Sequence, residues 1–347
     1  MVRMRDVAAR LGVSATTVSH VLSGKHQQYK ISAATVARGE KTARAMGYCK
    51  DALARSFREK RWYSLALAVE DLTNPFWTGV AIGAEGECVR QGYSLVVSNS
   101  GGTPDGERRA VRLLEERRVD GLVIAPLFAA DRTLHRLHRA GLPFVQINSE
   151  VPGLEVPCVQ TDHALGCALA VDHLVERGHR SILYLGGPVR QESFRERLAG
   201  FQEAVSRHPG VAAEVKLVRA EADAGQAALA ERLQRGVPRA VFAANIWLTL
   251  GSLRAIRAAG LSVPGDIEIV GFDDIALADL LAFPVTTVAQ DAQAIGREAV
   301  ARLLEVMNGG QPELMTRLAP CLVARPAKAQ EPRRLSLPSP LHSEAIS

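Results

Sequence analysis

Polar and aromatic side chains follow several short apolar runs of this chain, and their types suit the binding of a small polar molecule. Asp71, Asn74 and Phe76 come after the first run, and Asp273 and Asp274 come at the end of the last. Carboxylate and amide groups supply hydrogen-bond acceptors and donors, and an aromatic ring supplies an apolar face. Other runs end at Asn99, Asn148, Ser149 and Asn245. This set predicts a binding site for a polar ligand.

Groups that could carry out catalysis or hold a metal form no such pattern. His135 and His138 are three residues apart on a predicted helix, but no third ligand lies near them in the sequence, so surface exposure is favoured over metal binding. His163, His173 and His179 are not linked by any motif. The sequence holds no defensible Ser-His-Asp arrangement and no nucleotide-binding fingerprint. We therefore expect no enzymatic activity, no metal and no cofactor.

The N-terminal stretch 4–23 has the pattern of two short helices. Apolar residues recur at helical spacing on both sides of a short turn. Gly12 suits this turn because glycine tolerates a positive φ, and Ser14 can cap the second helix. Two short helices across such a turn form a helix-turn-helix, whose second helix can lie in the DNA major groove.

Charge supports an interaction with nucleic acid. Residues 1–60 hold 12 Lys and Arg against 4 Asp and Glu, whereas the remaining 287 residues hold 30 against 33. Neutralising DNA phosphates requires positive charge close to the duplex. A solvated basic face is the alternative, but the coincidence with the helix-turn-helix favours DNA binding.

Residues 33–46 predict a third helix, which begins after Ser32 and ends at Gly47 as a C-cap. Gly39 in its interior should cost about 1 kcal/mol relative to alanine. Close approach of a neighbouring helix is the simplest reason for a glycine there. Residues 1–48 therefore form a small all-α domain, and the amphipathic segment 50–60 bridges to the next one.

From residue 63 on, short apolar runs alternate with helical patterns in two series. The runs are 65–72, 93–99, 121–126 and 143–148 in the first series, and 181–187, 240–245 and 267–274 in the second. Apolar runs separated by helices indicate parallel sheets built from βαβ units. We expect two α/β lobes that divide near Pro157 to Asp162. Ligands of such sheets lie outside the carboxyl ends of the strands, where the polar side chains stand.

Length and composition set further bounds. A chain of 347 residues exceeds one typical compact domain. No apolar run approaches the roughly 18 residues of a membrane span, and no signal peptide is visible. The five cysteines are scattered and form no CxxC pair. We expect a cytoplasmic protein without a membrane partner, and a disordered tail after Pro326 because of its prolines and polar residues.

Motifs spread over residues 3 to about 326 resemble those of the lac repressor (LacI/GalR) family of transcription factors. They are RDVAARLGVSATTVSHVLSG at 5–24, ALARSF at 52–57, NPFW at 74–77, RVDGLVIAP at 118–126, LVERGHRSILYLGGP at 174–188, RERLAGF at 195–201 and GLSVPGDIEIVGFDDI at 260–275. The resemblance implies an N-terminal all-α helix-turn-helix domain followed by an α/β, periplasmic-binding-protein-like effector domain of two parallel-sheet lobes. Members of this family bind operator DNA as dimers and respond to a small molecule, often a sugar.

At the DNA end, the resemblance assigns base reading to early residues of the second helix. These residues are Ala15, Thr16 and His20, while Thr17 and Ser19 are expected to meet phosphates. A histidine can approach guanine acceptors, although it lacks the two-pronged contact of arginine. A phosphate contact without sequence information is the alternative for His20.

The bridging segment carries two further expected DNA contacts. Arg55 stands where a basic residue follows the DNA backbone, and Phe57 stands where an apolar wedge enters the minor groove and kinks the duplex. The alternative for Phe57 is packing on the lobe below. The loop between Gly24 and Ser32 is longer than in many relatives, so its contacts stay open.

At the effector end, the resemblance points to seven residues. They are Phe76, Trp77, Asp162, Ser193, Arg197, Asn245 and Asp273. Arg197 and Asp273 are expected to flank the floor of the site, but Arg197 could instead pair with Glu196 or Glu203 on a helix surface, and Asp273 could cap a following helix. Ile246 replaces the aspartate usual in the family, which should leave a more apolar wall.

These inferences predict a homodimeric, sequence-specific regulator, and specifically a repressor of a palindromic operator that is controlled by a sugar-like effector between two lobes. The expected domains are 1–48, a hinge at 49–61, an effector domain at 62–326 and a tail at 327–347. Within the effector domain, lobe 1 takes 62–160 and 291–318, and lobe 2 takes 161–290 and 319–326. The alternatives are a sugar-binding transport component and an enzyme acting on a small polyol.

Overall fold

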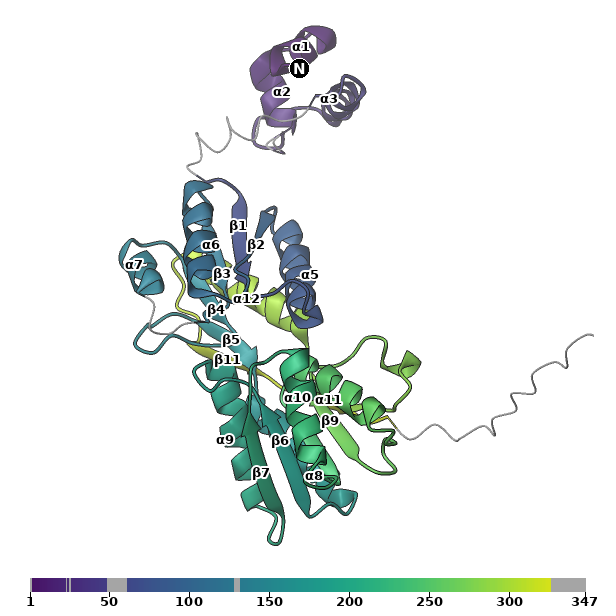
Figure 1. Cartoon of the computed structure of the whole chain (residues 1–347). Coiled ribbons are helices and arrows are strands. Elements are labelled where there is room, and N and C mark those ends of the chain that lie inside the picture. The colour runs from purple at the N-terminus through teal and green to yellow at the C-terminus, as the bar shows by residue number, and fades with distance from the viewer. Residues whose placement is uncertain (1, 23, 25, 49–60, 128–131, 326–347) are drawn as a thin grey trace, which may run out of the picture. The chain divides into compact units, whose positions relative to one another are not determined.

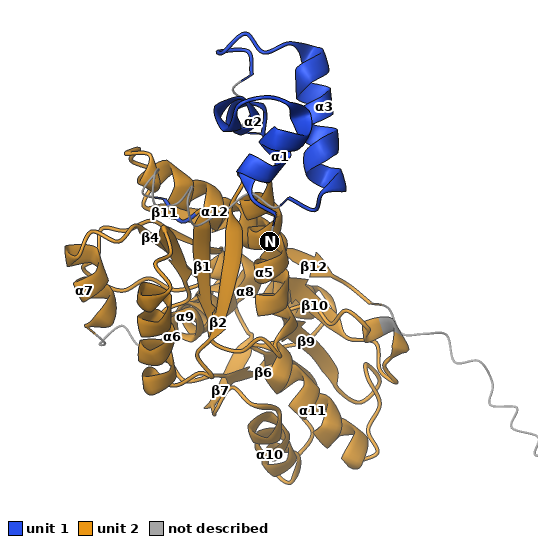
Figure 2. Ribbon diagram, turned by 90° about the horizontal axis from the view of Figure 1, so that it is seen from above, with its two compact units in different colours: residues 1–62 blue, residues 63–347 orange. Residues whose placement is uncertain are grey.

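The computed structural model describes residues 2–22, 24, 26–48, 61–127 and 132–325, and the chain divides into two compact units (Figures 1 and 2). The first unit comprises residues 1–62 and the second comprises residues 63–347. Each unit has a hydrophobic core of its own.

The first unit contains three helices, α1 (Met4–Leu11), α2 (Ala15–Leu22) and α3 (Ala33–Ala45). Gly12, between α1 and α2, has φ +68°, and the Oγ of Ser14 accepts a hydrogen bond from the N–H of Thr17 at 3.0 Å. Both predictions for this turn are therefore confirmed. A core that includes Val7 and Val18 joins the three helices.

The third helix lies close to the second because of Gly39. A Cβ at this position would lie 2.8 Å from Cγ1 of Val21 in α2, closer than carbon atoms approach without a shift. This contact confirms close helix packing as the reason for the glycine. The helix begins after the N-cap Ser32 and is followed by Gly47 at φ +66°, where the N–H of Tyr48 reaches the carbonyl of Ala43 at 2.9 Å.

The first sheet of the second unit has the order β11-β5-β4-β3-β1-β2, with all neighbouring strands parallel. Its strands are β1 (Ser64–Val69), β2 (Ser94–Asn99), β3 (Gly121–Ile124), β4 (Phe144–Ile147), β5 (Cys158–Thr161) and β11 (Met315–Leu318). Its helices are α5 (Pro75–Arg90), α6 (Pro104–Glu116), α7 (Thr133–Arg139) and α12 (Ala292–Met307). Alternate residues of β1 enter two separate core clusters, so helices cover both faces of the sheet.

The second sheet has the order β12-β10-β9-β8-β6-β7. Its strands are β6 (Ser181–Gly186), β7 (Ala212–Leu217), β8 (Ala240–Ala243), β9 (Glu268–Phe272), β10 (Thr286–Ala289) and β12 (Cys321–Val323), of which only β12 runs antiparallel to its neighbour. Its helices are α8 (His163–Glu176), α9 (Glu192–Ser206), α10 (Ala222–Leu233), α11 (Ile246–Ala258) and the short 3₁₀ helix η1 (Ala278–Leu280). The expected two-lobed α/β architecture is confirmed (Figure 1).

The chain passes between the two sheets three times: after β5, between β10 and α12, and between β11 and β12. Polar contacts surround these crossings. The carboxylate of Glu196 on α9 accepts a hydrogen bond from the amide of Gln160 on β5 at 3.1 Å and lies 3.6 Å from the guanidinium of Arg317 on β11. The two lobes are therefore joined by side chains as well as by backbone.

Candidate functional site

The second helix of the first unit exposes the side chains predicted to meet DNA. Ala15 and Thr16 are exposed, and Thr17, Ser19 and His20 are partly exposed. Val18 and Val21 of the same helix are buried in the core of the unit. With 3.6 residues per turn, α2 thus turns an apolar stripe inward and presents the polar set outward.

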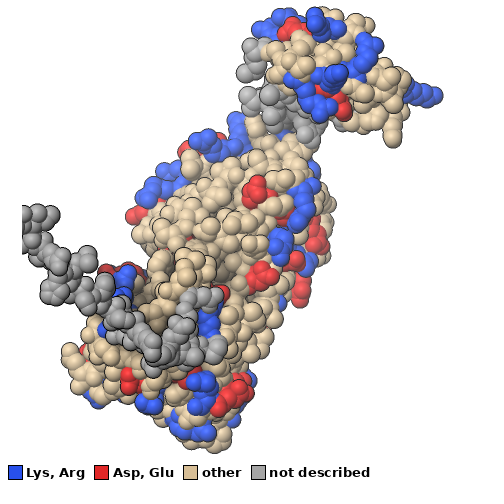
Figure 3. Space-filling view, turned by 90° about the vertical axis from the view of Figure 1, so that its right-hand side faces the viewer, with Lys and Arg blue, Asp and Glu red and all other residues tan. Residues whose placement is uncertain are grey.

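Basic side chains are prominent on the surface of the first unit. Figure 3 shows Lys and Arg over much of the first unit, whereas basic and acidic side chains are mixed over the visible face of the second. An exposed helix on a unit rich in Lys and Arg can approach a polyanion. Arg55 and Phe57 lie outside the described residues.

In the second unit, Arg197 of α9 lies inside the protein and not on a helix surface. Its residue is 5% exposed, its Nε donates a hydrogen bond to Nδ1 of His163 at 3.3 Å, and its Nη1 donates to the carbonyl of Ala244 at 2.6 Å. Its Cζ lies 3.9 Å from the centroid of the Phe272 ring. The alternative of a surface pair is therefore wrong: Glu196 bonds to Gln160 and Arg317, and Glu203 pairs with Arg207.

The hydrogen bond from Arg197 to His163 requires a neutral imidazole. Burial and the neighbouring guanidinium hold the pKa of His163 well below its usual value, while the main chain of Asn148 has the opposite effect. The unprotonated Nδ1 can then accept the bond from Arg197. His163 is the first residue of α8 and directly follows the first crossing between the lobes.

Asp273 stands at the carboxyl end of β9 in a left-handed conformation, with φ +76°. It is 6% exposed, and its carboxylate accepts hydrogen bonds from the N–H of Ile246 at 3.3 Å and from the amide of Gln290. The alternative that Asp273 caps a following helix is wrong, because it bonds to the start of the preceding helix α11. Backbone strain at a buried carboxylate is typical of functional sites.

The structure adds a residue that the sequence patterns did not single out. Glu70, at the end of β1, accepts a hydrogen bond from Nε1 of Trp77 at 3.1 Å. Burial raises the pKa of Glu70, the Trp77 bond and the charge of Arg197 lower it, and the charges of Asp71 and Asp273 raise it further. Glu70 of the first lobe is thus within electrostatic range of two charged groups of the second lobe.

The other expected effector residues differ in their surroundings. Asn245 caps α11 through its Oδ1, which accepts from the N–H of Leu248 at 2.8 Å, and Asp162 caps α8 in the same way with the N–H of Leu165 at 2.9 Å. Ser193 is buried in the first turn of α9.

The two neighbouring aromatic residues of α5 differ in burial. Phe76 is partly buried, whereas Trp77 is 1% exposed and packs in the core of the first lobe. The Trp77 ring therefore presents no open face in this structure. Ile246 is 3% exposed and belongs to a core cluster of the second lobe, so the expectation of an apolar wall does not hold for it.

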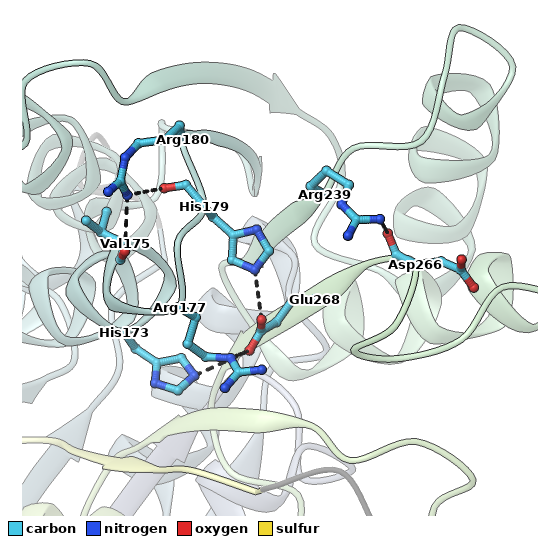
Figure 4. A network of polar contacts seen from close by, with 8 residues as sticks. All are labelled: His173, Val175, Arg177, His179, Arg180, Arg239, Asp266 and Glu268. Carbon is cyan, nitrogen blue, oxygen red and sulfur yellow. Dashed lines mark hydrogen bonds and ion pairs between the residues drawn. The ribbon is translucent and has the colours of Figure 1, made fainter.

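Two histidines that the sequence left unlinked share one carboxylate (Figure 4). Nε2 of His179 lies 2.8 Å from Oε2 of Glu268, and Nε2 of His173 lies 3.6 Å from Oε1. Arg177 pairs with the same carboxylate. This network sits at the amino end of β9, which is the end of the strand opposite to Asp273, so we assign it to the stability of the second lobe.

The described residues contain neither a candidate metal site nor a candidate membrane span. In that part of the chain, no three His, Cys, Asp or Glu side chains are grouped so that they could hold a metal ion. His138 is exposed and His135 is partly exposed. None of the described helices combines the length and the apolarity that crossing a membrane requires.

Comparison with known proteins identifies both units. Residues 3–51 match the family model of bacterial regulatory proteins, lacI family, and residues 171–326 match the periplasmic binding protein-like domain. The HTH-type transcriptional repressor PurR of Vibrio atlanticus is 31% identical over 311 residues, which cover 88% of this chain and 92% of the relative. The ribose operon repressor of Escherichia coli is 31% identical over 332 residues, 94% of this chain and 99% of the relative.

The chain belongs to the lacI family. A solved structure of the lac repressor dimer, bound to operator and an anti-inducer, has a TM-score of 0.80 at 30% identity and covers 93% of this chain and 98% of its own. The CelR–cellobiose complex has a TM-score of 0.70 at 29% identity, with 94% and 100% covered. Membership of the lacI family confirms the predicted resemblance and fold, and it makes the chain a DNA-binding transcription regulator instead of a transport component.

Proposed function

We propose that this lacI-family regulator is a repressor that grips a palindromic operator as a homodimer and that a small sugar-like effector, bound between the lobes, sets its affinity for DNA. The observation that carries this proposal is the buried Arg197, whose bonded partners are neutral and whose charge, like that of Asp273 at the end of β9, acts on the carboxylate of Glu70 at the end of β1. A guanidinium, carboxylates and amides together match the hydroxyl groups of a polyol.

We assign base reading to Ala15, Thr16 and His20 and phosphate contacts to Thr17 and Ser19, because α2 exposes these side chains. The expected domain boundaries remain part of the proposal, with 1–48 as the DNA reader and 49–61 as a hinge helix. Within that hinge, Arg55 would follow the DNA backbone and Phe57 would open a base step. Phe57→Ala should then abolish operator bending in a FRET assay, and unchanged bending would refute the wedge.

For the effector we assign direct contacts to Phe76, Ser193, Arg197 and Asp273, and a supporting role to Trp77 through Glu70. Asp162 and Asn245 have side-chain oxygens that are bonded as helix caps, so their contacts would use the remaining lone pairs or the Asn245 amide. The relatives include a ribose operon repressor and a CelR–cellobiose complex, and both names favour a sugar. We further propose that the protein binds its effector without converting it chemically, and that it acts in the cytoplasm.

A thermal-shift screen of the full-length protein tests this proposal. The panel contains ribose, cellobiose, sugar acids, phosphosugars and purines, and every hit is then tested in operator binding. We expect at least one hit to raise the melting temperature and to change operator affinity. Hits that leave DNA binding unchanged would refute allosteric control, and consumption of a hit by the protein would favour an enzyme.

A further inference from the structure

An aromatic ring outside the helix-turn-helix lies flat against the expected reading residue. The rings of His20 on α2 and Tyr29 have centroids 3.6 Å apart and planes inclined by 16°. Tyr29 is 51% exposed and His20 is partly exposed, so the pair lies at the surface beside the exposed face of α2. Tyr29 belongs to the loop between α2 and α3.

This loop is held in shape by its own backbone. The N–H of Ile31 donates to the carbonyl of His26 at 2.9 Å, and the N–H of Lys30 donates to the carbonyl of Gln27 at 3.2 Å. Lys30 closes the turn in a left-handed conformation, with φ +50°. Tyr29 therefore lies on a closed turn, three residues before Ser32, the N-cap of α3, and it can constrain the ring against which it stacks.

We propose that Tyr29 is a positioning residue for DNA reading, which fixes the plane of the His20 imidazole so that the ring edge faces a base. This inference rests on the proposed reading role of His20. Both ring nitrogens of histidine lie in the ring plane, so a ring stacked on one face does not cover them. An imidazole held in this way loses less rotational freedom when the complex forms.

The phenol hydroxyl is not needed for this role. Aromatic stacking is worth about 0.5–1.5 kcal/mol, which corresponds to roughly a 3- to 10-fold change in affinity. Tyr29→Phe keeps the ring and should bind the operator within about 2-fold of the wild type. Tyr29→Leu keeps bulk without an aromatic face and should lose about 3- to 10-fold, as should Tyr29→Ala.

The test is a double-mutant cycle in the full-length protein on a duplex selected from a random pool by the wild-type protein. Dissociation constants are measured for His20→Ala, Tyr29→Leu and the double variant, on the selected duplex and on a scrambled one. We expect the loss caused by Tyr29→Leu to vanish in the His20→Ala background and to be absent on scrambled DNA. Thermal melts of each variant check that the first unit remains folded.

The outcomes distinguish failure of the Tyr29 positioning role from failure of the His20 reading role. Equal losses from Tyr29→Leu with and without His20 would show that Tyr29 contacts DNA by itself, and tighter binding by Tyr29→Leu would show that the stack hides His20. Either result overturns the positioning role. If His20→Ala binds the selected duplex like the wild type, the reading role of His20 fails, and the positioning role fails with it.

Discussion

Replacing Arg197 by methionine tests whether this residue serves ligand binding or the stability of the fold. Methionine removes two hydrogen bonds with a charged donor, worth about 1.5–3 kcal/mol each, and a desolvated cation–π contact of about 2 kcal/mol. It also removes the cost of holding a guanidinium out of water, which is several kcal/mol. Because these contributions oppose each other and have similar size, we expect the free energy of unfolding to change by less than about 2 kcal/mol.

Ligand binding should respond much more strongly. Loss of one charged hydrogen bond to the effector costs about 1.5–3 kcal/mol, which is about 10- to 150-fold in the dissociation constant. Denaturant unfolding measures the first quantity, and calorimetric titration with a hit from the screen measures the second. Arg195→Met is a matched control, since Arg195 lies on the same helix with a side chain that is 62% exposed. Destabilisation beyond about 4 kcal/mol with unchanged ligand affinity would refute the reasoning, because it would make Arg197 a structural residue.

Three further predictions concern the helices and the lobe crossing. His20→Ala should cost about 1–3 kcal/mol on the cognate operator and relax one base position in a selection experiment, and equal losses on random DNA would reduce it to a phosphate contact. Gly39→Ala should destabilise the first unit by about 1–3 kcal/mol, although alanine has the better helix propensity, because the added Cβ would lie too close to Val21. Gly86→Ala is the control: its added Cβ would have no atom within 4 Å, so this variant should be neutral or stabilising in thermal melts. The lowered pKa of His163 means that the unfolded chain binds more protons below about pH 6.5, so the free energy of unfolding should fall between about pH 7 and 5.5 by up to about 1.4 kcal/mol per pH unit. His163→Gln should flatten this slope, and a slope unchanged from the wild type would contradict the assignment.

The fold was largely predictable where apolar runs are buried on both faces. All seven predicted runs contain strands, and six of these strands are fully or almost fully buried. Strand β7 was missed because five of its six residues are exposed at the edge of its sheet, so it has no apolar pattern. Strands β5, β10 and β11 have four residues each, two of them polar, and β12 has only three residues, so none of them forms an apolar run.

The candidate site was predictable only by residue type. The family resemblance placed Arg197 and Asp273 beside the floor of the site, but the sequence could not tell that Arg197 is buried against His163, which lies 34 positions away. The sequence could not separate the roles of Phe76 and Trp77. Neighbouring helix residues point about 100° apart, and only the packed structure shows that Trp77 is the one that turns inward. Glu70 was missed for a similar reason, since adjacent carboxylates at the end of a strand point to opposite faces.

Coupling between the two sites of the full-length protein shows whether an effector controls operator binding. Operator affinity is measured by fluorescence anisotropy with and without a saturating hit from the screen, and the affinity for that hit is measured by calorimetry with and without the operator. Allosteric control predicts that both dissociation constants change by the same factor, of the order of 5- to 150-fold. A ligand that binds free and operator-bound protein with equal affinity would contradict it.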